Sequence, residues 1–211
     1  MNKKPSLLII GNSNVGKSSI TRLLLPNPRN FKGKIGKHPG STLLIKPVTQ
    51  TNLPYKIIDL PGFGYIRRTS KRREEHIKKQ IVLHIEKHHQ DYFFGLVIIN
   101  ILRIEDEIKK YFLHNQATIP LSFELIKFLR EFEIPILLIF NKIDKISNFD
   151  KAKNINLFVE SAEKYELNLV HLNEHKQNNK TEIPYLEFSV LKKINIEKLK
   201  ETIHNVLKKK F

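Results

Sequence analysis

The chain contains 211 residues, of which 40% are hydrophobic, enough for one well-buried α/β domain and too few for two comfortable ones. It has no cysteine, which excludes disulfides, thiolate zinc sites and cysteine nucleophiles and fits a reducing cytoplasm. Lysine and arginine total 37 against 21 aspartates and glutamates, and the resulting net charge of +16 favours a polyanionic partner such as RNA, DNA or an anionic membrane; charges solvated over a lysine-rich surface are the alternative.

Short apolar runs alternate with charged, helix-like segments along the chain. Strands are expected at residues 7–10, 43–48, 55–60, 93–102, 134–140 and 185–190. Helices are expected at residues 17–25, 71–90, 122–132 with Ser122 as the cap, 151–165 and 196–209. This alternation predicts an α/β fold, a mostly parallel six-stranded sheet with helices on both faces.

Two segments fit this alternation poorly. Residues 103–121 receive no assignment, and the polar residues near 171–182 are interpreted as a surface insertion. No apolar run is long enough to cross a bilayer, so we expect no membrane contact through a spanning helix. We therefore expect residues 1–211 to form a single domain, and we expect a monomer.

A phosphate-binding loop is the strongest motif. Gly11, Asn12, Ser13, Asn14, Val15, Gly16, Lys17 and Ser18 match the pattern G-x-x-x-x-G-K-[ST] between a strand and a helix. Glycines let the backbone wrap around phosphates, and the helix start adds its positive dipole end. Lys17 is expected to contact the β- and γ-phosphates, and the Ser18 hydroxyl to bind Mg²⁺. A glycine turn that binds nothing is the alternative interpretation.

A second motif selects the base. Asn141, Lys142 and Asp144 follow the strand expected at 134–140, at the sheet edge where ligands of such folds bind. The Asp144 carboxylate can accept hydrogen bonds from guanine N1–H and the 2-amino group, a donor pair that adenine lacks. Lys142 can cover the base plane and Asn141 can brace the loop, so the motif favours guanine over adenine.

Two further segments are expected to respond to the γ-phosphate. Asp59 ends a strand and is expected to hold Mg²⁺ through water, while the Gly62 N–H meets the γ-phosphate. Thr42 follows a basic loop and is a candidate second Mg²⁺ ligand; a residue that merely starts a strand is the alternative. Such contacts exist only with triphosphate bound, which makes both segments candidate switches.

These residues together resemble the TRAFAC-class GTPases and, within them, the archaeal branch of the EngB-type ribosome-biogenesis GTPases. The resemblance is carried by the phosphate loop through Ser19, by Pro39-Gly40-Ser41-Thr42, by Asp59-Leu60-Pro61-Gly62-Phe63-Gly64-Tyr65, and by Asn141-Lys142-Ile143-Asp144. It implies a P-loop NTPase G domain, GTP hydrolysis with Mg²⁺, and a role in assembling the large ribosomal subunit. It also implies that backbone N–H groups of Phe188, Ser189 and Val190 contact the guanine O6, although the usual glycine-rich turn is missing there.

The resemblance further implies how the reaction proceeds. Lys17, Thr42 and Gly62 are the expected catalytic groups. Phe63 has no polar atom to orient the attacking water, and Asn14 matches an asparagine that helps related GTPases bind K⁺. We therefore expect slow intrinsic turnover that K⁺ or a ribosomal partner raises.

Basic residues surround both candidate switches. They are Lys32, Lys34, Lys37, Arg67, Arg68, Lys71, Arg72, Arg73, Lys78 and Lys79. Their position suggests a ribosomal RNA contact that the bound GTP or GDP controls; a solvated helix face is the alternative. Two other functions stay open from sequence: an RNA-binding assembly module with negligible hydrolysis, and a signalling or trafficking GTPase. A zinc site at His84 and His88 is disfavoured, because the stretch His84-Ile85-Glu86-Lys87-His88 has the spacing of H-E-x-x-H but not its glutamate position, and an exposed helix face is the alternative.

Overall fold

The computed structural model describes residues 4–31, 45, 47–62, 71–114, 119–176 and 179–210. Its strands are β1 (Ser6–Gly11), β2 (Pro47–Val48), β3 (Lys56–Asp59), β4 (Tyr92–Asn100), β5 (Ile136–Asn141), β6 (Asn168–His171) and β7 (Glu182–Phe188). Its α-helices are α1 (Lys17–Leu24), α2 (Lys71–His88), α3 (Ile104–His114), α4 (Leu121–Glu131), α5 (Asn148–Glu163) and α6 (Ile196–Lys210). Short 3₁₀ helices include η3 (Ile101–Arg103) and η4 (Ile143–Lys145).

The strands form one seven-stranded sheet in the order β2-β3-β1-β4-β5-β7-β6. Every neighbouring pair runs parallel except β2 and β3, which form an antiparallel pair. The carboxyl ends of the parallel strands therefore meet at one edge of the sheet, where α/β folds bind ligands.

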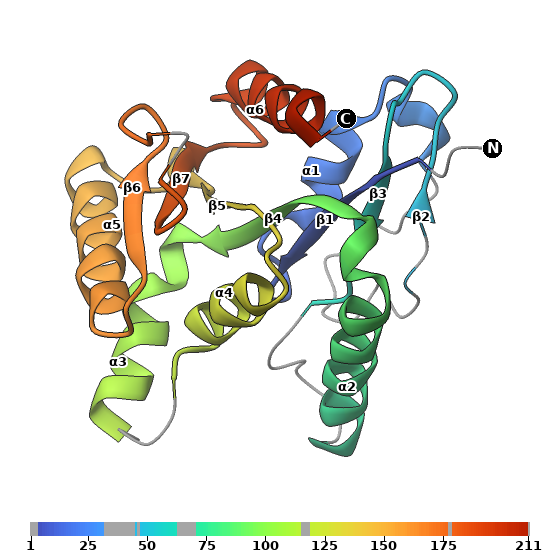
Figure 1. Cartoon of the computed structure of the whole chain (residues 1–211). Coiled ribbons are helices and arrows are strands. Elements are labelled where there is room, and N and C mark those ends of the chain that lie inside the picture. Colours follow the sequence, from blue (N-terminus) through green and yellow to red (C-terminus); the bar gives the residue numbers. More distant parts are fainter. Residues whose placement is uncertain are drawn as a thin grey trace.

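Helices cover both faces of this sheet (Figure 1). Along β1, Leu8 and Ile10 pack in a cluster with residues of α2, α3, α4 and α5, whereas Leu7 and Ile9 pack in a second cluster with residues of α1 and α6. Successive side chains of a strand point to opposite faces, so a continuous apolar run fills two cores at once. The apolar runs in the sequence thus reflect a sheet buried on both sides.

The sheet has seven strands, and the expectation of six was wrong. The additional strand, β6, has only four residues and pairs with β7 alone, at the sheet edge. A short strand with one exposed and two half-buried residues lacks the apolar run that identifies the central strands. His171 and Glu182, the outer residues of the expected insertion, belong to β6 and β7.

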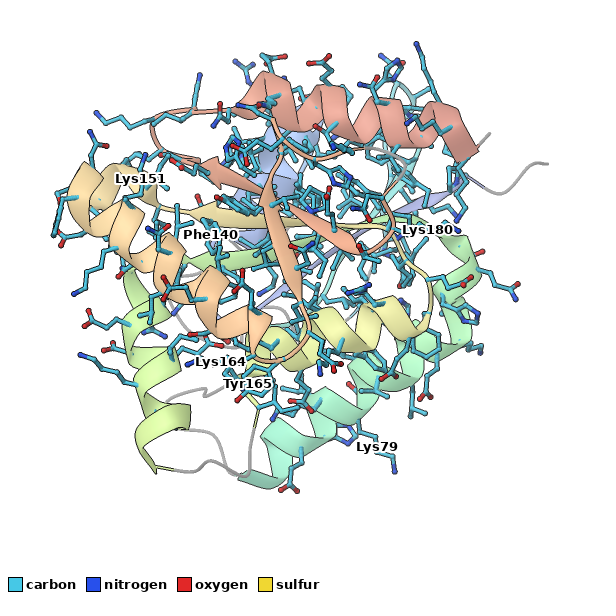
Figure 2. The ribbon with its side chains drawn as sticks, turned by 60° about the vertical axis from the view of Figure 1, so that its left-hand side comes forward. Lys79, Phe140, Lys151, Lys164, Tyr165 and Lys180 are labelled. Atoms are coloured by element: carbon cyan, nitrogen blue, oxygen red, sulfur yellow. The ribbon has the colours of Figure 1, made fainter. Side chains whose placement is uncertain are left out.

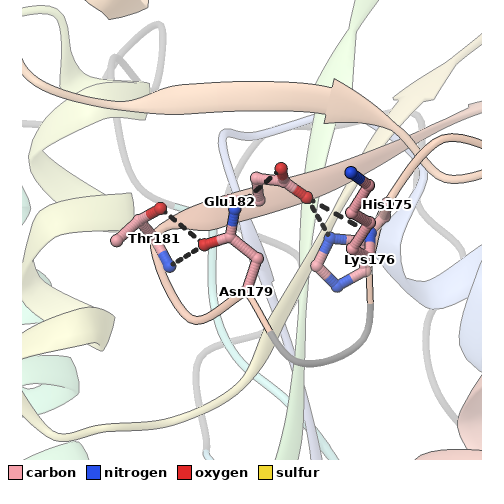
Figure 3. Close-up of polar contacts among 5 residues, drawn as sticks. All are labelled: His175, Lys176, Asn179, Thr181 and Glu182. Atoms are coloured by element: carbon pink, nitrogen blue, oxygen red, sulfur yellow. Dashed lines mark hydrogen bonds and ion pairs between the residues drawn. The ribbon is translucent and has the colours of Figure 1, made fainter.

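The connection between β6 and β7 is held by the Glu182 carboxylate (Figure 3). Asn179 Nδ2 donates to Glu182 Oε1 at 2.8 Å, the Lys176 backbone N–H donates to Oε2 at 3.2 Å, and His175 Nδ1 lies 3.2 Å from the same oxygen. The Thr181 hydroxyl donates to Asn179 Oδ1 at 2.6 Å. These hydrogen bonds stabilise the connection that leads from the end of β6 to the start of its parallel neighbour β7. The described part of this connection contains no helix.

Two helix expectations also change. Residues 103–121, left unassigned from sequence, contain α3. Ser122 does not cap α4, because that helix begins at Leu121 behind Pro120 and the Ser122 hydroxyl instead donates to Glu107 Oε1 on α3 at 2.6 Å. The helix expected from residue 151 begins at Asn148, where the Ser147 side chain accepts from the Asp150 N–H. No helix in the described ranges is long and apolar enough to cross a membrane.

Candidate functional site

The phosphate loop connects β1 to α1 at the carboxyl edge of the sheet. Gly16 has φ +106°, and a Cβ there would lie 2.3 Å from Asn141 Nδ2. A Cβ on Gly11 would lie 2.3 Å from the Ile98 carbonyl oxygen of β4. Both positions therefore require glycine, because a side chain would collide with the next strand or with the base-selecting segment.

Lys17 lies inside this loop. Its Nζ donates to the carbonyl oxygens of Gly11 at 3.1 Å and Asn12 at 2.9 Å. Burial lowers the pKa of Lys17 to about 8, and the nearby Asp59 carboxylate opposes part of that shift. The Thr21 hydroxyl, one turn into α1, donates to the Lys17 carbonyl at 3.1 Å. The loop thus holds the Lys17 ammonium against its own carbonyl groups, from which a phosphate chain could take over these hydrogen bonds.

Ser18 and Asp59 meet although they are 41 residues apart. The Ser18 hydroxyl donates to Asp59 Oδ2 at 2.7 Å, while the buried Asp59 Oδ1 has no hydrogen-bond partner among the described residues. Burial raises the pKa of Asp59, and the Ser18 hydrogen bond and the Lys17 charge act against that rise. A hydroxyl beside a carboxylate oxygen without a partner is an oxygen donor set that suits Mg²⁺. The residues present therefore fit the expected ion.

Gly62 is packed against the phosphate loop. A Cβ on Gly62 would lie 2.5 Å from Ser13 Oγ and 2.7 Å from Ser13 Cα. Leu60 and Pro61 are buried, and the Leu60 N–H donates to the Ile9 carbonyl at 3.1 Å. The chain after Asp59 thus runs directly onto the loop that would hold the γ-phosphate. Residues 40–42 and 63–68, with the expected Gly40, Ser41, Thr42 and Phe63, lie outside the described residues.

Asn141 joins three segments. Its Nδ2 donates to the Val15 carbonyl at 2.7 Å, and its Oδ1 accepts from the Val190 N–H at 3.4 Å. The Lys142 ammonium donates to the Asn14 carbonyl at 2.6 Å, and Lys142 itself has φ 72°. The base-selecting segment is therefore fastened to the phosphate loop by two side chains, as a bracing role for Asn141 requires.

The segment after β7 contacts residues 141–144. The Ser189 hydroxyl donates to Asp144 Oδ1 at 2.5 Å and accepts from the Lys192 N–H at 3.0 Å. Phe188 ends β7 with its side chain fully buried in the core, so any contact from that residue would come from its backbone. The structure thus brings Ser189 and Val190 to the segment 141–144, the neighbourhood that a base-binding role requires.

Two cations that sequence reasoning did not assign to the site also belong to its surroundings. Burial lowers the pKa of Lys142, and the charges of Lys145 and Arg103 lower it further, while Asp144 opposes the shift. Lys145 could have been noticed from its place directly after Asp144. Arg103 lies in the segment left unassigned, and its charge interaction with Lys142 in the folded chain reveals it.

The remaining predicted residues that the structure describes lie in the phosphate loop, at the start of α1 and on α2. Ser19 lies in the first turn of α1, and Asn12 Oδ1 is buried without a hydrogen-bond partner among the described residues. His84 and His88 stack with ring centroids 4.7 Å apart, and no group of three metal-binding side chains occurs within the described ranges. Of the expected RNA contacts, Lys78 and Lys79 lie on α2, whereas 32, 34, 37, 67 and 68 lie outside the described residues.

Comparison with known proteins agrees with this geometry. The family model described as "50S ribosome-binding GTPase" matches residues 6–142. A "Probable GTP-binding protein EngB" from Pyrococcus horikoshii is 31% identical over 97% of this chain and 85% of its own length. The protein of the same description from Methanococcus aeolicus is 31% identical over 75% of this chain and 66% of its own length.

A solved structure extends the agreement to three dimensions. The crystal structure of "a probable GTP-binding protein engB" has a TM-score of 0.76 and 31% identity, covering 97% of this chain and 99% of that one. The family match includes the phosphate loop, Asp59 and the start of the base-selecting segment. The chain therefore belongs to the EngB family of P-loop GTPases and is itself a GTPase.

Proposed function

We propose that this GTPase acts as a nucleotide switch during assembly of the large ribosomal subunit, with ribosomal RNA as its main contact. The observation that carries the proposal is the match to a family described as 50S ribosome-binding, together with a net charge of +16. A strongly basic protein is attracted to the phosphate backbone of RNA, and this attraction supplies much of the affinity of such complexes.

The nucleotide site supports this proposal by its connectivity. Asn141 and Lys142 fasten the base-selecting segment to the phosphate loop, and Ser18 joins that loop to Asp59. The phosphates of a guanine nucleotide in this site would accept hydrogen bonds from Lys17 and from the N–H groups of the loop. Its base would donate hydrogen bonds to Asp144. The phosphates and the base would thus contact segments that are already joined to one another: the phosphate loop, the chain at Asp59 and residues 141–144.

Hydrolysis would use groups already in place. Lys17 would exchange its bonds to the Gly11 and Asn12 carbonyls for phosphate oxygens and would stabilise the negative charge that develops there. Ser18, Asp59 and the proposed Thr42 would hold Mg²⁺, which when bound neutralises phosphate charge. Gly62, already packed against Ser13, would present its N–H to the γ-phosphate. Loss of that phosphate releases Gly62 and the segment after it.

Turnover is proposed to be slow without a partner. Phe63 follows Gly62 and carries no polar atom that could orient the attacking water. Asn14, with φ 62° and an exposed side chain, is the proposed K⁺ contact. Equal hydrolysis rates in K⁺ and Na⁺ buffers, with and without ribosomal subunits, would refute this part of the proposal.

Co-sedimentation with purified ribosomal subunits tests the switch. We expect the protein to pellet with the large subunit when loaded with a GTP analogue and to stay largely in the supernatant when loaded with GDP or empty. The small subunit is the matched control, because it presents the same phosphate chemistry. Equal pelleting in all three nucleotide states, or an equal preference for both subunits, contradicts the proposal.

A further inference from the structure

Exposed apolar side chains concentrate at the end of the sheet that holds the site. Among the described residues, six large hydrophobic side chains are exposed, and four of them are Leu102, Phe149, Leu191 and Ile194. These four lie on the connections that follow β4, β5 and β7, three strands that are neighbours in the sheet. Phe149 is 79% exposed and Leu191 is 71% exposed, so neither packs against the core. Contiguous exposed apolar groups are typical of interaction sites.

Side-chain contacts hold the three connections together. Asn154 Nδ2 in α5 donates to the Ile101 carbonyl of η3 at 3.0 Å, which joins the first connection to the second. The second and third are joined by the Ser189–Asp144 hydrogen bond, and an ion pair of 2.6 Å between Lys151 and Glu187 joins α5 to the end of β7. Lys151 marks this end of the sheet in Figure 2. The exposed apolar residues therefore lie on connections that are held together by side-chain contacts.

The third connection, residues 189–195, is a closed turn. The Ile194 N–H donates to the Ser189 carbonyl at 3.0 Å, and Asn195 Nδ2 donates to the Glu187 carbonyl at 2.8 Å. Lys193 and Asn195 have left-handed φ values of 56° and 61°. These bonds close the backbone of the turn with Leu191, Lys192 and Lys193 exposed, so a ligand would not have to form the turn itself.

The charges on these connections are one-sided. Residues 101–103, 142–147 and 189–195 contain five cations, Arg103, Lys142, Lys145, Lys192 and Lys193, against the carboxylate of Asp144, while Phe149 has an exposed carboxylate, that of Asp150, directly beside it. All five except Lys142 are exposed. Asp144 is already engaged by Ser189. These like charges repel one another unless an anionic partner neutralises them.

We propose that this surface, formed by Leu102, Arg103, Lys145, Phe149, Leu191, Lys192, Lys193 and Ile194, binds unpaired RNA. The proposal rests on the proposed function, because it names where on the protein a ribosomal RNA contact lies. This surface differs from the basic residues around the two switches, because it lies on the segments proposed to contact guanine. RNA bound here lies against the connections that carry Asp144 and Ser189.

The chemistry favours unpaired RNA over a duplex or a protein. Lysines and an arginine match backbone phosphates, and the isolated Phe149 ring offers a flat face for one base. Bases in a duplex already stack on each other, so they cannot cover that ring. Lysine is depleted at the centre of protein–protein interfaces, whereas here Leu191 and Ile194 flank two adjacent lysines within the same turn.

Paired variants of the full chain test the surface. Phe149→Ala removes the ring, and Leu83→Ala on α2, 53% exposed and away from the surface, is its control. Lys192→Gln/Lys193→Gln removes two surface charges. Lys180→Gln/Lys208→Gln is its control, because it removes the same charge from exposed positions near the opposite end of the sheet; Lys180 is labelled in Figure 2. All four proteins are expected to keep wild-type affinity for GTP, which shows that the site is folded.

Two measurements are made on each protein. The first is the affinity for a labelled single-stranded oligoribonucleotide and for the same sequence in a duplex, over a range of salt concentrations. Phe149→Ala should weaken single-strand binding roughly 5- to 100-fold, the range that one stacked base supplies. Lys192→Gln/Lys193→Gln should reduce the slope of log affinity against log salt by about 1.4. Both controls should bind like the wild type.

The second measurement is co-sedimentation with the large ribosomal subunit in the GTP-analogue state. Loss of pelleting in the two surface variants alone supports the surface. If the wild type does not pellet, the proposed function fails first. If it pellets and the surface variants pellet equally well, only this surface is refuted. If the surface variants stop pelleting but the wild type does not bind single-stranded RNA, the surface contacts a protein and the RNA assignment is wrong.

Discussion

Asn141 connects the fold of the site to nucleotide binding, so its removal should affect both. Asn141→Ala deletes the donor to the Val15 carbonyl at 2.7 Å and the acceptor for the Val190 N–H. Asn141 is 2% exposed, so water cannot easily replace either bond. A buried group left without its partner costs about 1–3 kcal/mol. We expect unfolding to become easier by about 2 kcal/mol, which lowers Tm by roughly 4–8 °C in a chain of this size.

The same substitution should weaken GTP binding. Without Asn141, the Lys142 ammonium, which donates to the Asn14 carbonyl, is the remaining side-chain hydrogen bond between residues 141–144 and the phosphate loop among the described residues. Binding GTP must then order two segments that are now only loosely joined. Losing about 1.4 kcal/mol of this preorganisation corresponds to a tenfold rise in Kd. Thermal unfolding and titration with a fluorescent GTP analogue measure the two effects.

Asn154 provides the matched control. It is also buried, and its Nδ2 donates to a backbone carbonyl, that of Ile101, at 3.0 Å. Asn154→Ala should therefore lower Tm about as much as Asn141→Ala while leaving the Kd for GTP unchanged. If Asn154→Ala weakens GTP binding equally, global destabilisation explains both losses. If Asn141→Ala binds GTP like the wild type, the joining role is refuted.

Three further predictions test other parts of the molecule. Asp144→Asn replaces a carboxylate with an amide and should weaken GTP binding roughly 10²- to 10⁴-fold while favouring xanthosine triphosphate, measured by competition; unchanged preference for GTP would place guanine recognition elsewhere. Gly62→Ala forces a methyl group within 2.7 Å of Ser13 Cα, so GTP turnover should fall at least tenfold, and normal turnover would show that Gly62 is not held there during the reaction. Burial, and secondarily the charge of His88, lower the pKa of His84 below 6.5, so the folded state binds that proton less readily than the unfolded state and stability falls as the pH drops through 6.5. Urea unfolding between about pH 7.5 and 5 should show a weaker acid loss in His84→Phe, and an unchanged loss would exclude His84 as its cause.

Local patterns identified the central strands and the two nucleotide motifs. The apolar runs of β1, β4 and β5 are continuous because each strand is buried on both faces of the sheet. A strand with one exposed face would instead alternate apolar and polar residues. The phosphate loop depends on glycines at fixed spacing, and Gly16 shows why: its φ is +106° and its nearest neighbour is a side chain of the base-selecting segment. Features that depend on a residue's own backbone are visible in the sequence.

Edge and helix-end features were less visible. β6 has four residues and one strand neighbour, so its pairing depends on β7 rather than on its own apolar content. Ser122 has the chemistry of a helix cap, but Glu107 from α3 competes for its hydroxyl. The hydroxyl of a capping residue predicted from sequence can instead donate a hydrogen bond to a carboxylate that the fold brings near.

The amino-acid sequence by itself determined the fold class and the family, and it predicts the phosphate loop and the guanine-binding role of Asp144, because each follows from apolar periodicity or from residues close together in the chain. Only the tertiary structure placed Ser18 on Asp59, Asn141 on Val15 and Ser189 on Asp144, contacts between residues 41, 126 and 45 positions apart. It alone also placed the connections that carry Leu102, Phe149 and Leu191 after three neighbouring strands of the sheet. Parallel strands end at a common edge, so residues remote in the chain become neighbours only once the order of the strands is fixed.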